Sequence, residues 1–261
     1  MSSLRYAVRV DAPGTHLAEI ELRFTPSGES VDLTLPAWCP GSYLIRDYAR
    51  FVRDVEVRGD DGRPRVVHKV DKQTWRVARD GARELTVRYG VYGNDLTVRT
   101  NHIGDDHAFL HGPATFMFPV DMRREACEVE LHFPTGWELT TAAQSVGELS
   151  ATAAPKKRLS GSRIRTASID ELYDHPIHLG VVRTYALTAS VPTKLVIWGQ
   201  RSPGGQFDEQ RLVTDLSAIV DDHIKRLGEA PFTEYTFILM LSHDAYGGLE
   251  HRGSSVNLFN P

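Results

Sequence analysis

The chain has 261 residues, 41% of them apolar and 25% charged, which is typical of a globular protein large enough for about two domains. Its 30 basic and 34 acidic side chains give a net charge of −4 without a basic block, which argues against nucleic acid or an anionic membrane as a partner. No segment has the ~20 apolar residues of a membrane helix, and the first residues lack the apolar core of a signal peptide. We therefore expect a cytoplasmic protein in which Cys39 and Cys127 are reduced core thiols.

Short strands are predicted throughout the first half of the chain. Apolar and polar residues alternate there, which places one face of each strand against a core. Turn signals such as Asp-Gly and Pro-x-Gly separate the runs. Strands without intervening helices predict a mainly β fold, beginning with an all-β sandwich or saddle-shaped domain over residues 1–168. The alternating runs cover residues 6–10, 18–24, 31–35, 85–91 and 127–133.

The segment from Thr141 to Arg163 is small, polar and basic, and it includes Pro155-Lys-Lys-Arg158. We interpret it as a hairpin loop rather than a basic binding patch. A change of domain is expected shortly afterwards, so that residues 169–261 begin a second, mixed α and β domain.

In this second part the periodicity changes. Alternating residues predict strands at 185–191 and 194–198, and the spacing over 207–227 predicts a helix with one apolar stripe. Gly228 and Pro231 end that helix. Residues 236–241 are apolar on both faces, which predicts a buried strand. The second part is therefore expected to be β-rich with one helix.

Common catalytic motifs are absent. His107 and His111 have the spacing of a helical metal pair, but they lack the glutamate of an HExxH metalloprotease and lie between glycines, so a structural role in a loop or strand end is favoured. Pro176 disfavours a helical pair at His175 and His178. The sequence contains no set of zinc ligands, no G-x-S-x-G elbow and no phosphate-binding glycine loop.

Three segments carry the informative motifs. Residues 35–50 read LPAWCPGSYLIRDYAR, residues 92–100 read YGNDLTVRT and are followed by HGPATFMF at 111–118, and residues 246–254 read YGGLEHRGS. Together they resemble the glycyl aminopeptidases, zinc enzymes related to aminopeptidase N that often carry a PDZ domain. The match runs in order across nearly the whole chain. Gly253 stands where the family pattern GGLEHRNS has asparagine, which puts the local polar network in doubt.

The third segment also has a physical interpretation. Two glycines after a buried strand let another backbone approach closely. A glutamate beyond them would lie at a sheet edge, where an extended peptide can add as a strand and present its terminal amine to the carboxylate. The alternative is an ordinary edge-strand turn with a solvated acid. The resemblance implies that Glu250 recognises the free N-terminus, that Gly247 and Gly248 face the substrate, and that His251 orients Glu250 or the substrate carbonyl.

The resemblance also implies that residues 169–261 are the opening lobe of a thermolysin-like catalytic domain. Zinc would be the cofactor of the parent protein, held by an HExxH helix after residue 261 and a further glutamate, so the chain alone should be inactive. A peptide with a free N-terminus would be the substrate. The alternative is a non-catalytic peptide-binding or scaffold protein that keeps the family's β domain.

One cluster in the first signature has two interpretations. Tyr43, Arg46, Tyr48 and Arg50 could line the cleft between domains or form a packing motif at their interface. We favour packing, because mixed aromatic and arginine clusters are common at interfaces.

Overall fold

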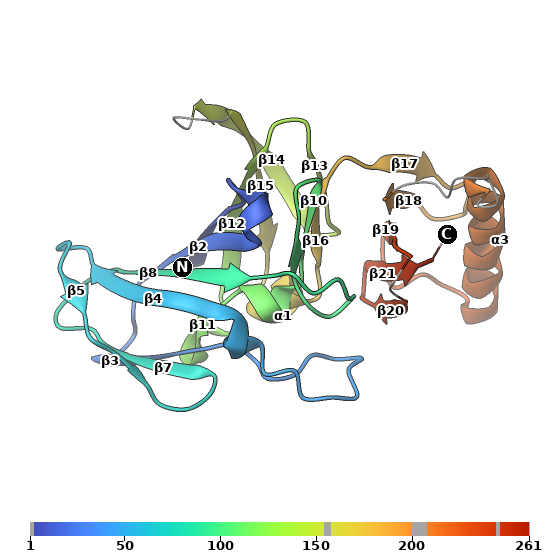
Figure 1. Ribbon diagram of the computed structural model, residues 1–261. Coiled ribbons are helices and arrows are strands. Elements are labelled where there is room, and N and C mark those ends of the chain that lie inside the picture. The colour runs from blue at the N-terminus through green and yellow to red at the C-terminus, as the bar shows by residue number, and fades with distance from the viewer. Residues whose placement is uncertain (1–2, 154–157, 200–207, 244–245, 261) are drawn as a thin grey trace.

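The computed structural model describes residues 3–153, 158–199, 208–243 and 246–260 (Figure 1). These residues form one eight-stranded sheet, two four-stranded sheets and one five-stranded sheet, together with two short helices and one of 19 residues. The predicted mainly β architecture is confirmed.

The eight-stranded sheet forms the centre of the first part. Its order is β14-β15-β12-β1-β2-β8-β4-β5, and its neighbours are antiparallel except for the parallel pair β1 and β12. Alternate residues are buried, as in β2, where Ala18, Ile20, Leu22 and Phe24 face the core. The strands are β1 (Ser3–Arg9), β2 (Leu17–Phe24), β4 (Val52–Gly59), β5 (Pro64–Arg65), β8 (Leu85–Tyr92), β12 (Ala126–Pro134), β14 (Gln144–Ala153) and β15 (Arg158–Thr166).

Two smaller sheets complete the first part. One has the order β13-β16-β10-β9 and the other β11-β3-β7-β6. They share one hydrophobic cluster with the large sheet. Their strands are β3 (Ser30–Thr34), β6 (Val67–Lys69), β7 (Thr74–Ala78), β9 (His102–Ile103), β10 (His107–Leu110), β11 (Phe118–Pro119), β13 (Glu138–Thr140) and β16 (Ile177–Gly180); the helices are α1 (Gly112–Thr115) and α2 (Ile169–Tyr173), with 3-10 turns at Pro13–Thr15, Tyr48–Phe51 and Val120–Met122.

The hairpin loop predicted over residues 141–163 is wrong. Most of this segment is the strand pair β14 and β15, and only residues 154–157, which include the first three residues of the basic tetrapeptide, lie outside the described residues. β15 pairs with β12 over its whole length, from Leu159 opposite Pro134 to Thr166 opposite Cys127. An existing sheet edge supplies the hydrogen bonds that the weak strand propensity of the segment does not reveal.

The five-stranded sheet forms the second part, in the order β17-β18-β19-β21-β20. The inner strands β18, β19 and β21 are parallel, and each edge strand is antiparallel to its neighbour. The predicted buried strand and the predicted helix are both present. Their bounds are β17 (Arg183–Ala186), β18 (Thr193–Trp198), α3 (Glu209–Leu227), β19 (Tyr235–Leu241), β20 (Gly247–Glu250) and β21 (Ser254–Phe259).

Helix α3 begins and ends where its sequence requires. The Asp208 carboxylate caps the start by accepting the N–H of Arg211 at 3.0 Å. Gly228 follows the last turn with φ 88°, a left-handed conformation that favours glycine, and its N–H donates to the carbonyl oxygen of Ile224 at 2.8 Å. Lys225 and Arg226 lie in the last turn, where cations stabilise the helix dipole.

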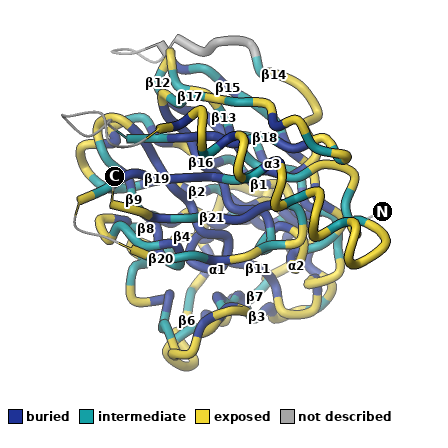
Figure 2. The backbone as a smooth tube through the Cα atoms, turned by 90° about the vertical axis from the view of Figure 1, so that its right-hand side faces the viewer, coloured by how far each residue is buried: buried dark blue, intermediate teal, exposed yellow. Residues whose placement is uncertain are grey.

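Both faces of the five-stranded sheet are covered. Leu239 and Leu241 belong to one cluster with Val213 of α3, whereas Ile238 and Met240 belong to another that includes residues of the first part. Figure 1 shows α3 on the outer side of the sheet and the first part on the other, and Figure 2 shows β19 and β21 as buried. Strand β20 is thereby held beside the first part of the molecule.

Residues 169–180 pack with the first part. β16 pairs with β10 and β13, and its apolar residues share the first cluster with those of α2. The domain boundary after residue 168 stays a prediction. A fragment ending there would lose strand β16 and the buried apolar side chains of α2.

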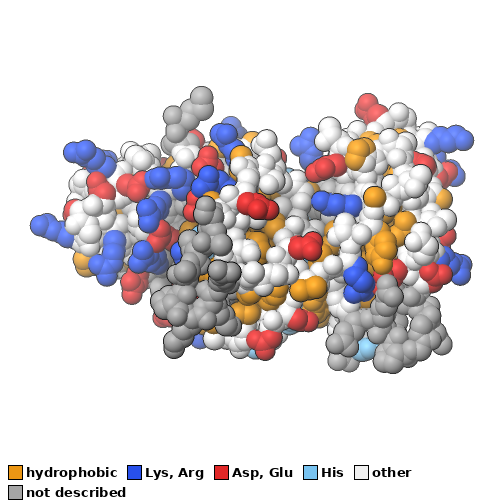
Figure 3. Space-filling model, turned by 90° about the horizontal axis from the view of Figure 1, so that it is seen from above, with side chains coloured by type: hydrophobic (Ala, Val, Ile, Leu, Met, Phe, Trp, Pro, Cys, Tyr) orange, Lys and Arg blue, Asp and Glu red, His pale blue; other side chains and the backbone are white. Residues whose placement is uncertain are grey.

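Three further observations concern the cysteines, the helices and the surface charges. Cys39 and Cys127 are free and buried, as predicted. No helix among the described residues combines the length and apolar character needed to cross a membrane. Basic and acidic side chains are interspersed over the face shown in Figure 3.

Candidate functional site

Strand β20 is an edge strand, and within the described residues it pairs only with β21. The N–H of His251 donates to the carbonyl oxygen of Ser254 at 2.8 Å and closes the hairpin between them. Backbone groups of alternate residues point towards the partner in an antiparallel pair, so those of Gly248 and Glu250 face away from β21. The edge position expected for Glu250 is observed, and an extended peptide can add there.

A single arginine joins this edge to the first signature. One Nη2 atom of Arg99 donates to the carbonyl oxygens of Gly41 and Gly248, at 3.0 and 3.1 Å. Gly41 has φ 78°, and a Cβ built on it would lie 2.6 Å from Cδ1 of Leu249. Only glycine therefore fits at position 41 without a shift. The three segments that carry the family resemblance thus meet at β20.

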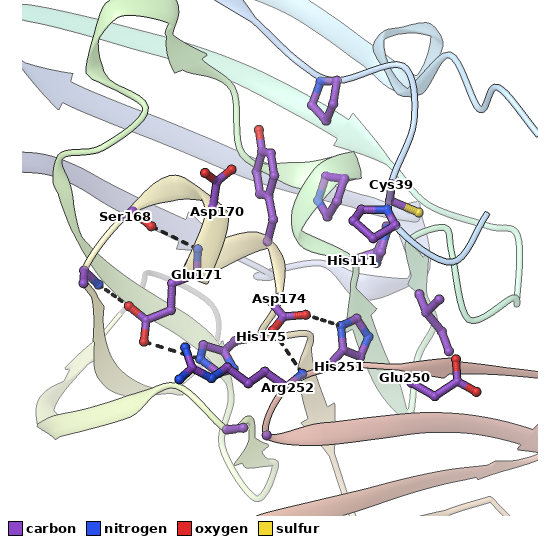
Figure 4. A pocket seen from close by; sticks show the side chains of 18 of the residues that line it. Cys39, His111, Ser168, Asp170, Glu171, Asp174, His175, Glu250, His251 and Arg252 are labelled. Carbon is purple, nitrogen blue, oxygen red and sulfur yellow. Dashed lines mark hydrogen bonds and ion pairs between the residues drawn. The ribbon is translucent and has the colours of Figure 1, made fainter. Parts of the chain in front are cut away.

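A large cleft opens beside β20 (Figure 4). Its volume is about 1830 Å³, and both parts of the chain line it. The first part contributes residues 36–40, 167–168, 170–171 and 173–175 among others, and the second contributes residues 229–234 and 249–253. Glu250 and His251 both line the cleft, so the strand edge and the cavity form one site.

The Glu250 side chain is exposed in this cleft. In Figure 4 it lies apart from the network of dashed bonds around Asp174. Within the described part of the chain its carboxylate accepts no hydrogen bond and forms no ion pair, and its charge adds to burial in raising the pKa of Tyr235. An ionised acceptor is therefore available to a cationic ligand.

His251 points the other way and contacts the first part. Its Nδ1 lies 3.2 Å from Oδ1 of Asp174, and the N–H of Arg252 donates to Oδ2 of the same carboxylate at 3.0 Å. Burial raises the pKa of Asp174, but these bonds outweigh it and hold that pKa below its ordinary value. Nε2 of His251 is buried and has no hydrogen-bond partner among the described residues.

Helix α2 fixes Asp174 in place. Ser168 caps the helix by accepting the N–H of Glu171 at 3.2 Å, and the Glu171 carboxylate accepts the N–H of Ala167. Nε2 of His175 lies 3.7 Å from the Glu171 carboxylate. Burial lowers the pKa of His175 in spite of the nearby carboxylates of Glu171 and Asp174.

Gly253 lies opposite this helix end. A Cβ built on it would be 3.3 Å from Cβ of Ala142 and 3.9 Å from Cε1 of His175. A side chain at this position would therefore face the buried ring of His175, and glycine leaves that contact unmade.

His111 forms part of the cleft wall on the opposite side. It is buried, and neither ring nitrogen has a partner in the described part of the chain. Burial, together with the charges of His251, Arg99 and Arg46, lowers its pKa to about 3. The ring is therefore neutral at physiological pH.

The members of the tyrosine and arginine cluster at residues 43–50, predicted either to line a cleft or to pack at an interface, differ in their surroundings. Tyr48 is buried, donates its hydroxyl to Sγ of Cys39 at 3.1 Å and contacts the His111 ring at 5.7 Å between centroids. Arg46 donates to Oγ of Ser42, and the Arg50 guanidinium lies over the ring of Phe51. Tyr43 is fully exposed. Tyr48 packs within the first part of the chain and Tyr43 does not pack, so the interface role predicted for the cluster stays a prediction.

His107 occupies a strand, in agreement with the structural role predicted for it. Its ring bonds to His102 at 2.6 Å and to His178 at 3.2 Å, and it stacks on Trp198 with centroids 3.5 Å apart. Across the described residues, no group of three or more His, Cys, Asp or Glu side chains is arranged to hold a metal ion.

Comparison with known families decides the relationship. The sequence matches the Peptidase M61 N-terminal domain over residues 5–181. The chain belongs to this family. This match to a peptidase family, together with the structural match to an aminopeptidase N family protein given below, confirms the family resemblance found in the sequence. None of the curated proteins matches.

Solved structures give the same result for this M61 family member. An aminopeptidase N family protein from Idiomarina loihiensis matches with a TM-score of 0.87 at 28% identity, and the match covers 98% of this chain and 42% of that protein. An M1 zinc metallopeptidase from Deinococcus radiodurans shares the fold, with a TM-score of 0.59 at 10% identity over 99% of this chain and 60% of that one. The same peptidase bound to a Tyr-Ser-Ala substrate matches with a TM-score of 0.53 at 12% identity, over 100% and 59%.

The site holds residues to which the sequence assigned no role. Arg99 lies inside a quoted signature, but nothing in its spacing showed what it contacts. For His111 the sequence predicted only a structural role and not its place in the cleft wall. Asp174 lies outside the signatures and 77 positions from His251, so only the fold reveals the pair.

Proposed function

We propose that the chain is the N-terminal portion of a zinc-dependent aminopeptidase that removes N-terminal residues from peptides. Membership of the M61 family and the likeness to an aminopeptidase N family protein support this proposal. The chain spans less than half of that relative, so the activity is proposed for a longer protein.

The chain's own contribution is recognition of the substrate's free N-terminus. Glu250 would accept hydrogen bonds from the terminal ammonium group, and the peptide would lie along the open edge of β20, where Gly247 and Gly248 let its backbone approach. His251 would orient Glu250 or the substrate carbonyl. The observation that carries the proposal is the exposed Glu250 carboxylate, without a bonding partner in the described chain, at an open sheet edge inside the cleft.

Binding of the charged terminal amine would explain why the enzyme acts only at the N-terminal end of a peptide. A carboxylate binds an ammonium group by a charge-assisted hydrogen bond, which is about twice as strong as a neutral one. An internal peptide nitrogen has no charge and cannot replace it. A carboxylate at the end of the substrate strand therefore selects chains that begin there.

We expect the zinc of the longer protein to be bound by an HExxH helix after residue 261; across the described residues, no His, Cys, Asp or Glu group of three or more is arranged to hold a metal ion. When bound, such an ion polarises a carbonyl and lowers the pKa of water. The residues of this chain position the substrate and exclude solvent around its N-terminus. Alone, the chain is expected to cleave no peptide.

A second function is a non-catalytic peptide-binding or scaffold protein. The open edge and the cleft need no metal, so binding alone is consistent with them. The two functions differ in what accompanies the chain. An HExxH helix encoded directly after Pro261 would fit the peptidase, and a stop codon would fit the scaffold.

The test uses the longer protein and the 261-residue chain in parallel. Release of the first residue from a short peptide by the longer protein, abolished by a chelator and restored by zinc, is the expected result. The chain alone should release nothing and retain no stoichiometric zinc. A longer protein that binds peptides but never cleaves them would favour the scaffold.

A further inference from the structure

We propose that Arg99 binds the free carboxylate of a short peptide whose ammonium group is held by Glu250, so that the site prefers dipeptides with two charged ends. This inference rests on the proposed function of Glu250 and adds a class of substrate to it. The first part of the chain would then contribute a residue that determines specificity.

Arg99 lies at the outer edge of β20, in the path of an added strand. Its Nη2 donates to the carbonyl oxygen of Gly248 at 3.1 Å, and that carbonyl faces away from β21. Val98 lies beside the start of the same strand, because a Cβ built on Gly247 would be 3.5 Å from Cγ2 of Val98. A peptide that runs along this edge from Glu250, antiparallel to β20, therefore meets the guanidinium group at Gly248.

The positive charge of Arg99 is paired with no carboxylate of the described chain. Its two bonds there run from Nη2 to the carbonyl oxygens of Gly41 and Gly248. Nε is buried and unpaired in the same part of the chain, whereas Nη1 is neither bonded there nor fully enclosed. A guanidinium group has five N–H donors and no acceptor, so Nη1 is available to donate to an anion.

A second arginine adds to the positive charge at this place. Arg46 donates from Nε to Oγ of Ser42 at 2.8 Å, and it forms no ion pair with any described residue. Ser42 directly follows the glycine whose carbonyl oxygen accepts from Arg99, so both guanidinium groups contact one loop. Burial raises the pKa of Tyr48, and the charges of both arginines act on it in the opposite direction. The arginine end of the edge is therefore positive, while the other end carries the negative Glu250.

The spacing of these two ends fits a dipeptide. Successive residues of a strand are about 3.2–3.4 Å apart, so Gly248 and Glu250 are separated by about 6.5–7 Å along the edge. Two residues of an extended peptide span at most about 7 Å. A dipeptide with its ammonium group at Glu250 thus brings its carboxylate to Arg99, where a charge-assisted bond can form. A longer peptide has an uncharged amide at this point and must pass the guanidinium group.

A purely structural tie between Arg99 and β20 is the competing explanation. It predicts that Arg99→Met lowers stability and weakens the binding of every ligand by the same factor. Recognition of a carboxylate predicts instead that the variant loses its preference for a charged C-terminus. The ratio of affinities for a dipeptide and its amide, measured within one variant, cancels general damage to the fold. Arg124→Met is the control, because Arg124 is an exposed arginine of the same part of the chain.

The experiment measures inhibition constants in the longer aminopeptidase, from initial rates of release of the first residue of a reference free-amine peptide. The competing ligands are Gly-Ala, Gly-Ala amide, and a six-residue peptide with its amide. In the wild type we expect Gly-Ala to bind about ten-fold more tightly than its amide, because a charge-assisted bond replaces a neutral one, and the six-residue pair to bind alike. The preference should disappear in Arg99→Met, persist in part in Arg99→Lys, which keeps the charge, and stay unchanged in Arg124→Met.

Several results separate this inference from the proposed function. Equal affinity for Gly-Ala and its amide in the wild type overturns the inference, and so does a preference that survives in Arg99→Met. An equal preference in the six-residue pair also overturns it, because the general field of the protein would then attract any carboxylate. Glu250→Gln should weaken Gly-Ala and its amide by the same factor. If N-acetyl-Gly-Ala binds as well as Gly-Ala, the proposed role of Glu250 fails, whatever the ratio for the amide.

Discussion

Nη2 of Arg99 donates to the carbonyl oxygen of Gly248 at 3.1 Å, although the two residues are 149 positions apart. The same atom donates to the carbonyl oxygen of Gly41. One guanidinium group therefore fixes the edge strand against the first signature loop. It also occupies the outward-facing carbonyl of Gly248, so a peptide added to this edge would use the other outward-facing backbone groups of Gly248 and Glu250.

Replacing Arg99 should weaken the attachment of strand β20 to the first part of the chain. Arg99→Met keeps the length of the aliphatic stem but removes both hydrogen bonds, so we expect the free energy of unfolding to fall by about 1–3 kcal/mol. Denaturant unfolding measures the change. Arg124→Met is the control, since Arg124 is exposed, and its effect should stay within about 0.5 kcal/mol. Equal effects of the two substitutions would show that the guanidinium bonds do not stabilise the edge.

Two glycines at the site should respond differently to alanine. At Gly41 the left-handed backbone costs about 1–2 kcal/mol, and the clash with Leu249 adds about 1–3 kcal/mol, so Gly41→Ala should be clearly destabilising. At Gly248 the nearest atom to an added Cβ is Oδ1 of Asn257 at 3.5 Å, an ordinary contact. Gly248→Ala should leave the thermal midpoint nearly unchanged.

Gly248→Ala also tests the substrate edge. If a peptide backbone approaches Gly248, the added methyl group should weaken binding of a short free-amine peptide to a fold that is otherwise intact. Unchanged peptide affinity in this variant would show that the substrate does not lie along β20 at this residue.

Acid should destabilise the protein through its buried histidines. Burial lowers the pKa of His178 from 6.5 to about 3, so between these values the unfolded chain binds a proton that the folded chain does not. The stability contributed by the neutral ring is fully present above pH 6.5 and is lost as the pH falls towards 3, by about 1.4 kcal/mol per pH unit.

The measurement is the difference in unfolding free energy between pH 7.0 and pH 5.5. His178→Gln removes the titrating group, so the loss of stability over this interval should be smaller by about 1 kcal/mol than in the wild type. His68→Gln, at an exposed position, should retain the wild-type difference. If both variants lose stability as the wild type does, His178 is not held neutral by burial.

The boundary predicted after residue 168 can be tested with two fragments. Residues 169–180 bring four fully buried apolar side chains into the first core, Ile169, Leu172, Ile177 and Leu179, and each stabilises a fold by about 1.5–3 kcal/mol when buried. We therefore expect residues 1–181 to unfold at a higher temperature than residues 1–168. Equal midpoints would support the boundary at 168, and loss of cooperative unfolding only in the shorter fragment would move it to about 181.

Sequence patterns predicted the fold well where burial is periodic. The alternation at Ala18, Ile20 and Leu22 reports a strand directly, because one face is buried. The strands at 144–166 were missed because a sheet edge elsewhere in the chain determines them. β15 forms a ladder with β12, and β14 pairs with β15, which local propensity does not encode.

The sequence predicted only the part of the candidate site that lies in the β20–β21 hairpin. Glycines followed by a glutamate after a buried strand indicate an edge, and the edge is observed. The contacts that organise it come from elsewhere. Asp174 and Arg99 reach the hairpin across 77 and 149 positions, and no local pattern can encode such distances.

The central claim is that the Glu250 carboxylate recognises the substrate's terminal amine. Glu250→Gln keeps the size of the side chain and a hydrogen-bond acceptor but removes the charge. A charge-assisted bond is worth about 1.5–3 kcal/mol, so its loss predicts a fall of about ten- to a hundred-fold in kcat/KM for a free-amine peptide. Glu234→Gln is the control, because Glu234 is an exposed acid that lines the same cleft.

The most direct measurement compares kcat/KM of wild type and Glu250→Gln in the longer aminopeptidase, using one peptide with a free amine and the same peptide N-acetylated. We predict a large loss on the free amine, little further loss on the already poor acetylated peptide, and unchanged zinc content. Equal losses on both peptides, or no loss on the free amine, would contradict amine recognition by Glu250.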